Sequence, residues 1–256
     1  MPTATSSRMG HRLHRVFADL AGPGMIASAG GVLYLILFKD DATRIGWIYA
    51  LRSKSAADLA SATKEFRTDV GGGVKQFRTD NGTEFVNETF ASLCREKTIY
   101  HELTGVDRPK HNGVVERGLG LIQEGGMAAG LETPRLFHGQ LSDLDRYWVE
   151  AAVYMNESID TTATTANPHS KLPYEIYFGK LPPANTLAFM QPDFRLVHRS
   201  HRSEPKTDVC IHLNTGWNHP RDCVKVVTLS GQSSNTRNVT WEVDHLPIIA
   251  TTPDPG

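Results

Sequence analysis

Three carboxylates occupy positions from which they could act together on a phosphate ester. Asp19 and Asp80 each stand at the end of a short apolar run, and Glu116 stands near the start of an expected helix. Carboxylate oxygens are the ligands that hard divalent cations prefer, and two such ions on one phosphate could brace the attacking and leaving oxygens. Spacing alone leaves a second interpretation open. Asp80 could simply begin an Asn-Gly turn, in which Gly82 takes a positive φ, while the other two are surface acids.

The helix around Glu116 favours the metal site over ordinary surface acids. Its expected core face is an i, i+3, i+4, i+7 stripe formed by Val115, Gly118, Leu119 and Ile122. Glu116 is one position off this stripe, at the boundary between core and solvent. Asn112 is expected to cap the helix, so that the helix dipole favours the ionised form of Glu116. A semi-buried carboxylate beside two others is costly unless a cation neutralises the cluster.

The elements that must position these carboxylates follow from hydrophobic periodicity. We expect five strands, over residues 13–20, 32–38, 45–51, 74–79 and 98–103. Ser55 and Asn87 are expected to cap two helices, the first of which ends at the glycines 71–73. A third helix carries Glu116, and a fourth extends from about Leu144 to Glu157. This order predicts an α/β layered fold with a mixed five-stranded sheet.

The chain is expected to divide into four parts. These are a disordered tail (1–12), a catalytic core (13–160), a Pro-punctuated and partly basic connector (161–206), and a small β-rich module (207–256). Within the last part, three strands are expected over 208–213, 223–229 and 237–243. The basic cluster from Arg195 to Lys206 could follow a DNA backbone or could be a solvated linker, and the sequence favours neither.

Composition excludes several classes of protein. The 256 residues are 39% hydrophobic, with 27 basic and 28 acidic side chains, which is typical of a globular domain. No apolar run reaches the ~18 residues of a membrane span, and the first residues lack the apolar core of a secretion signal. We therefore expect no membrane association and a nuclear or cytoplasmic protein that is not secreted. The three cysteines lack CxxC spacing, and no zinc site is expected at His11 and His14.

Six segments, in order, resemble the integrase region of copia-type LTR retrotransposons. They are HRVFADLAGP, VLYLILFKDDATRIGWIY, FRTDNGTEF, HNGVVER, YWVEAAVYMN and PYEIYFGKLPP, and the similarity covers about Arg12 to Ala188. The resemblance implies a ribonuclease-H-like three-layer fold. It also implies that Asp19, Asp80 and Glu116 hold two Mg²⁺ or Mn²⁺ ions. The family reaction is 3′-end processing and strand transfer of element DNA into target DNA, carried out by a homo-oligomer.

Residues beside the three carboxylates are expected to play supporting roles. Asn81 and Gly82 would turn the chain sharply at the site, and Glu84 would orient it, although ordinary turn chemistry explains all three equally well. Four residues flanking Glu116 could contact DNA phosphate, namely Lys110, His111, Asn112 and Arg117. Solvation explains Lys110 equally well, whereas Arg117 matches the family's Glu-Arg pair. Asp40 and Asp41 are expected to form a hairpin turn rather than a second acidic site.

The sequence also departs from the family. Glycines at 118, 120, 125 and 126 predict that the helix bearing Glu116 is weak, at roughly 1 kcal/mol per glycine relative to alanine. No His/Cys zinc module precedes Asp19, and no protease or reverse transcriptase sequence is present, so the chain is expected to be a polyprotein fragment or a decayed or domesticated copy. Two functions therefore compete: an integrase-type enzyme, and a non-catalytic nucleic-acid-binding or protein-interaction remnant. A transposase or ribonuclease H is a weaker third.

Overall fold

Five strands form a mixed sheet. They are β1 (Arg15–Ala21), β2 (Tyr34–Asp40), β3 (Gly46–Leu51), β4 (Gln76–Thr79) and β5 (Tyr100–Leu103), arranged in the order β3-β2-β1-β4-β5. The first three strands are antiparallel neighbours, while β4 is parallel to both β1 and β5. The predicted mixed five-stranded sheet is therefore confirmed. Its parallel half joins β1, which carries Asp19, to β4, which ends beside Asp80.

The structure is a computed structural model that describes residues 8–104, 112–136, 144–183, 187–216 and 223–240. Its α-helices are α1 (Ala56–Asp69), α2 (Glu88–Glu96), α3 (Gly113–Leu136), α4 (Trp148–Asp160) and α5 (Pro173–Phe178), with short 3₁₀ turns at Leu144–Tyr147 and Pro168–Ser170. The chain forms two compact units. The first comprises residues up to Met127 and from Asp143 to Asn185, and the second comprises the remainder. The division at residues 12, 160 and 206 stays a prediction.

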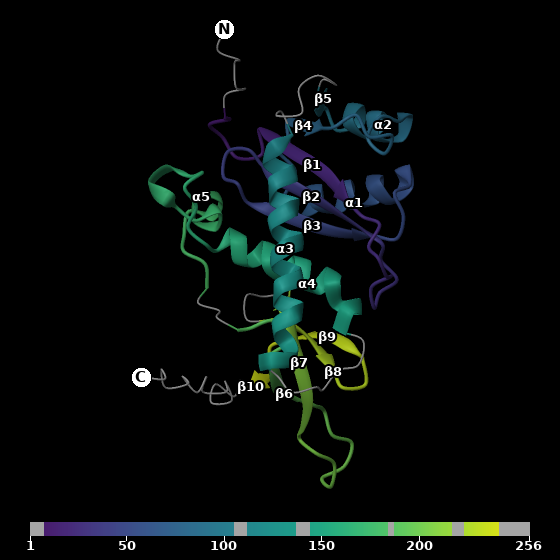
Figure 1. Cartoon of the computed structure of the whole chain (residues 1–256), viewed down its shortest axis with the longest axis vertical. Helices are drawn as coiled ribbons and strands as arrows, with labels where there is room; N and C mark the ends of the chain where they lie inside the picture. The colour runs from purple at the N-terminus through teal and green to yellow at the C-terminus, as the bar shows by residue number, and fades with distance from the viewer. Residues whose placement is uncertain (1–7, 105–111, 137–143, 184–186, 217–222, 241–256) are drawn as a thin grey trace, which may run out of the picture. The chain divides into compact units, whose positions relative to one another are not determined.

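Helices cover both faces of the sheet, so the first unit has three layers (Figure 1). Alternation along β1 sends neighbouring side chains to opposite faces. Val16 and Ala18 pack in one cluster with Phe66 of α1 and Phe90 of α2. Phe17 packs in a second cluster with residues of α3 and α4. Asp19 shares the parity of Phe17 and therefore belongs to the face that α3 covers.

The N-terminal caps predicted at Ser55 and Asn87 are present. The side chain of Ser55 accepts a hydrogen bond from the backbone N–H of Asp58, and that of Asn87 accepts one from Phe90. Each cap satisfies a backbone donor that the first helical turn leaves without a partner. After α1, the glycines at 71–73 all adopt positive φ angles, which stops the helix where the sequence predicts.

The glycines of α3 permit close packing, a role that the sequence prediction did not give them, while the low intrinsic stability of this helix stays a prediction. A Cβ on Gly118 would lie 3.1 Å from Leu37, and one on Gly126 would lie 3.2 Å from the backbone of Ala151 in α4. A larger residue at either position would push α3 away from its neighbours. Gly120 differs, because nothing lies within 4 Å of its Cβ position. The sequence placed Gly118 on the core face, as the structure does, but it did not show that Gly126 meets α4.

Helix α5 was not predicted, although the sequence carries its boundaries. Pro173 occupies its first position and Gly179 ends it in the left-handed conformation. This pattern of proline at the start and glycine after the end is a helix signature. The sequence predicted a connector here because the prolines were treated only as residues that interrupt helices and strands. Tyr177 of α5 joins the core cluster on the α1 side of the sheet.

The second unit contains an antiparallel five-stranded sheet. Its strands are β6 (Pro192–Leu196), β7 (Thr207–Thr215), β8 (Val224–Thr228), β9 (Ser233–Thr236) and β10 (Val239–Thr240), in the order β10-β6-β7-β8-β9. Its core includes Cys210, Val224 and Val226. Strands β6 and β9 were missed, and β9 reads Ser-Ser-Asn-Thr, which lacks the alternation that reveals a strand. Of the helices in the described parts, none is long and apolar enough to cross a membrane.

Candidate active site

Asp19, near the end of β1, lies in an acidic environment. Burial is the largest cause that raises the pKa of its carboxyl group from 3.8 to about 7. A hydrogen bond of 2.9 Å from the Leu20 backbone N–H opposes this rise. The negative charges of Asp80, Glu116 and Glu84 raise the pKa further. Three acidic side chains from later parts of the chain are thus near enough to act on Asp19.

Asp80 follows β4 and is held in a side-chain-stabilised turn. Its Oδ1 accepts a hydrogen bond of 3.0 Å from the Gly82 N–H, and the Asn81 side-chain amide donates to the Thr104 carbonyl at 2.8 Å. The predicted turn is present, but Gly82 does not take a positive φ. Space explains the glycine instead, because a Cβ there would lie 2.6 Å from Glu84 Oε1. The carboxylate of Glu84 therefore lies over Gly82.

Glu116 lies in the first turn of α3 and is exposed, which corrects the expected semi-buried position. Its backbone N–H donates to the Asn112 carbonyl at 3.2 Å, and that of Val115 donates to the same oxygen. Among the described residues, neither amide atom of buried Asn112 has a hydrogen-bond partner, so the expected side-chain cap is not seen there. Arg117, the next residue, is also exposed. Glu116 and Arg117 can therefore both be reached from solvent.

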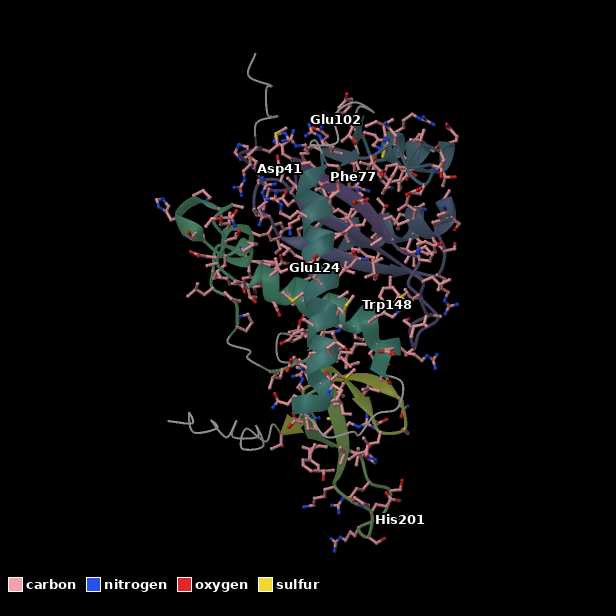
Figure 2. The ribbon with its side chains drawn as sticks, in the orientation of Figure 1. Asp41, Phe77, Glu102, Glu124, Trp148 and His201 are labelled. Carbon is pink, nitrogen blue, oxygen red and sulfur yellow. The ribbon has the colours of Figure 1, made fainter. Side chains whose placement is uncertain are left out.

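Two of the residues expected to contact DNA, Lys110 and His111, lie outside the described residues. Asp40 and Asp41 lie at the β2–β3 turn, as predicted, but both are buried. Asp41, labelled in Figure 2, pairs with Arg15 and is part of a buried ion cluster. Its role is accordingly structural.

Sequence reasoning missed two side chains behind Asp80. The hydroxyl of Thr79 donates to the Asp80 carbonyl at 2.9 Å and also lies 2.9 Å from His101 Nε2 on β5. Phe77 on β4 and Glu102 on β5 mark this corner of the sheet in Figure 2. A threonine and a histidine within short strands carry no periodic signal. The parallel register of β4 and β5, which brings them together, cannot be read from either segment alone.

Carboxylates alone make up this donor set, which suits a hard divalent cation. Every charged group that acts on Asp19 raises its pKa, so a bound cation would relieve a repulsion that is already present. In the described residues, however, no group of three or more His, Cys, Asp or Glu side chains is arranged to hold an ion. The carboxylates around Asp19 therefore suit a divalent metal ion by their chemistry and charge. Their side chains in this structure are not positioned to coordinate one.

Residues 11–109 match a known protein family, the integrase core domain. The Pol polyprotein of tobacco (Nicotiana tabacum) transposon TNT 1-94 is 34% identical over 117 residues, covering 44% of this chain and 9% of that protein. The Pol polyprotein of the feline endogenous virus ECE1 is 30% identical over 185 residues, covering 72% of this chain and 15% of that protein. The chain thus spans less than a sixth of either relative.

Among solved structures, the fold is similar to a chain of the simian T-cell lymphotropic virus intasome in complex with PP2A regulatory subunit B56 gamma. The TM-score is 0.54 at 13% identity, covering 95% of this chain and 83% of that one. At this identity the likeness concerns the fold alone. The class rests on the sequence comparisons: residues 11–109 match the integrase core domain, and both relatives are Pol polyproteins. The tobacco relative is a retrovirus-related Pol polyprotein from a transposon.

Proposed function

We propose that this chain is the catalytic region of a retrotransposon integrase. In this role it is a metal-dependent polynucleotidyl transferase that trims the 3′ ends of element DNA and joins them to target DNA. The observation that carries the proposal is the environment of Asp19, whose carboxyl group is acted on by Asp80, Glu116 and Glu84. The integrase core domain of residues 11–109 supports the same assignment.

Asp19, Asp80 and Glu116 would hold two Mg²⁺ or Mn²⁺ ions. Bound there, the ions would lower the pKa of the attacking hydroxyl and stabilise the departing oxyanion. The protein's contribution is to bring acidic side chains near one another: burial and the neighbouring charges raise the pKa of Asp19 to about 7, and a bound cation would lower it again. The Gly82 N–H restrains the Asp80 carboxylate through a hydrogen bond. Glu116 is supplied by the exposed first turn of α3.

The reaction requires no covalent bond between protein and DNA. In 3′-end processing, a water oxygen bonds to phosphorus, its proton passes to solvent, and the bond from phosphorus to the opposite oxygen breaks in line. In strand transfer, the DNA 3′-hydroxyl takes the place of water. Exposed Arg117 is positioned next to Glu116 in sequence and can pair with a phosphate oxygen. Lys110, His111 and Asn112 are proposed to contact the same DNA backbone.

The proposed partners are element-end DNA and target DNA. Joining two ends to one target requires more than one active site, so we propose a homo-oligomer as the active form. Such an enzyme acts on genomic DNA. We therefore propose that it works in the nucleus, or in the cytoplasm of a cell that has no nucleus.

A nicking and strand-transfer assay in Mn²⁺ with labelled element-end oligonucleotides tests the proposal. We expect Asp80→Asn and Glu116→Gln to lower product formation by more than about 100-fold, since residues behind metal ligands alone contribute 10–100-fold. Glu124→Gln is the matched control, because Glu124 is an exposed acid further along α3 (Figure 2). Equal activity of the wild-type protein and both site variants would refute the assignment.

A second candidate function is a nucleic-acid-binding remnant without catalysis. The absence of a ready coordination group among the described residues favours it, as does the uncharged open position at Gly120, one turn after Glu116. This function predicts salt-sensitive DNA binding. If the chain is a remnant, this binding should not change when a chelator is added or in Asp80→Asn. If the chain is an integrase, metal-dependent binding of DNA ends should weaken in both cases.

A further inference from the structure

Thr79 and His101 form a hydrogen-bonded pair behind Asp80. Thr79, the last residue of β4, is fully buried, and its Oγ1 lies 2.9 Å from both the Asp80 carbonyl and His101 Nε2. A threonine hydroxyl has a single hydrogen to donate. Since that hydrogen goes to the carbonyl of Asp80, His101 must donate to Oγ1 from a protonated Nε2. The chain of donors thus runs from His101 through Thr79 to the Asp80 backbone.

The pair lies on the face of the sheet opposite the carboxylates. His101 is the register partner of Phe77, which belongs to the core cluster of the α1 and α2 side. The ring of Phe90 meets the His101 ring edge-on, with centroids 4.9 Å apart at 74°. Thr79 is two residues from Phe77 and shares its face. Asp80 has the opposite parity, so neither member of the pair can touch a substrate bound at the carboxylates.

Thr104, the residue that follows β5, also holds both neighbours of Asp80. The Thr104 N–H donates to the Thr79 carbonyl at 2.9 Å, and the Asn81 side chain donates to the Thr104 carbonyl at 2.8 Å. With the Thr79–His101 pair, the peptide groups on both sides of Asp80 are fixed to β5 and the residue that follows it. Rotation of the backbone at Asp80 would break at least one of these bonds.

We propose that Thr79 and His101 are positioning residues that set the direction of the Asp80 carboxylate. This inference rests on the proposed function, because it assigns the two residues a role at that site. The pair holds the backbone carbonyl of Asp80 on the α1 and α2 side of the sheet. The Gly82 N–H holds the Asp80 carboxylate through a separate hydrogen bond. Loss of the Thr79 hydroxyl frees the Asp80 backbone and should also weaken the hydrogen bond from the Gly82 N–H to the Asp80 carboxylate.

The test compares Thr79→Val, which removes the hydroxyl, with Thr79→Ser, which keeps it. Thr63→Val is the matched control, because Thr63 is also fully buried and its hydroxyl donates to a backbone carbonyl, that of Leu59, at 2.8 Å. Two quantities are measured on the whole chain: Mn²⁺ affinity by calorimetry, and hydrogen exchange of the Gly82 amide by NMR. Neither requires catalytic turnover.

We expect Thr79→Val to lower Mn²⁺ affinity about 10-fold or more, the usual effect of losing a group that orients a metal ligand. The Gly82 amide should exchange faster by a similar factor. Thr79→Ser should restore both quantities, and Thr63→Val should leave both near wild type even if it lowers thermal stability. His101→Phe should resemble Thr79→Val and add little to it in the double variant, since both changes break one chain of donors.

Three results would overturn the inference. Thr79→Val could match Thr63→Val in both quantities, Thr79→Ser could fail to rescue, or the ¹⁵N shifts of His101 could show the proton on Nδ1. Failure of the proposed function would look different, because Asp80→Asn would then leave Mn²⁺ affinity unchanged. In that case the exchange rate of the Gly82 amide alone decides whether the pair holds the Asp80 turn.

Discussion

Lys39 and Asp160 form a pair of opposite charges buried between the sheet and its covering helices. Lys39 is 7% exposed and Asp160 is 6% exposed. The stem of Lys39 lies against Gly118 of α3, while the Asp160 carboxylate accepts hydrogen bonds from the Gly46 N–H. Burial lowers the pKa of Lys39 and raises that of Asp160 to about 7, and each charge partly offsets the shift of the other.

Asp160 should make folding stability depend on pH between about 4 and 7. Its folded pKa of about 7 lies above its ordinary value of 3.8, so in this window the folded state binds more protons than the unfolded state. The free energy of unfolding that this group contributes therefore falls as pH rises. Urea unfolding at several pH values should show a steeper fall for wild type than for Asp160→Asn, which keeps the contribution of Asp19. Parallel curves for the two proteins would contradict it.

Removing only one of the two charges should be more harmful than removing both. Lys39→Met leaves the Asp160 carboxylate uncompensated, which for buried pairs costs about 3–5 kcal/mol. The double variant Lys39→Met/Asp160→Asn removes both charges and should recover much of this loss. Denaturant unfolding of both variants at pH 8 measures the difference. A double variant no more stable than Lys39→Met would show that the two groups are not coupled.

Two alanine substitutions in α3 should have effects of opposite sign. Gly120→Ala adds a methyl group in open space and should stabilise the helix by up to about 1 kcal/mol. Gly126→Ala gains the same propensity, but its Cβ would meet the Ala151 backbone at 3.2 Å, so overpacking should make it destabilising by about 1–3 kcal/mol. Thermal unfolding of the pair checks this. Two stabilising substitutions would mean that α3 and α4 separate easily.

Gly82→Ala should separate stability from function. Because Gly82 lacks a positive φ, alanine is compatible with its backbone, and unfolding should change by less than about 0.5 kcal/mol. The new Cβ would displace the Glu84 carboxylate and approach Asp80 Oδ1 at 3.0 Å. Mn²⁺ affinity should therefore fall while the melting temperature holds. A large loss of stability with unchanged affinity would show that Gly82 serves the turn alone.

Much of the fold could be predicted because local signals agree with it. The side chains of Ser55 and Asn87 cap α1 and α2 as the sequence predicts, and the apolar runs mark the five strands of the first sheet. Helix α5 was missed because its prolines were interpreted only as breakers, and β9 because its residues are polar on both faces.

The site was harder to predict because it depends on packing between distant segments. The sequence singles out Asp19, Asp80 and Glu116, but it cannot show that Glu116 is exposed or that Glu84 also acts on Asp19. Lys39 and Asp160 carry the charges of ordinary surface residues, and only the tertiary arrangement buries them together.

Strand β5 is an edge strand of four residues that pairs only with β4 in the described sheet. Edge strands open locally at a lower free energy than a whole domain unfolds. Because β5 and the following residue Thr104 support Asp80, each such opening would also release the Asp80 turn. If Asp80 binds metal as proposed, the local opening equilibrium of β5 would set the fraction of molecules competent to bind it, and the apparent affinity would be reduced by that fraction. A partner or DNA strand that covers this edge would raise metal affinity without contacting any carboxylate.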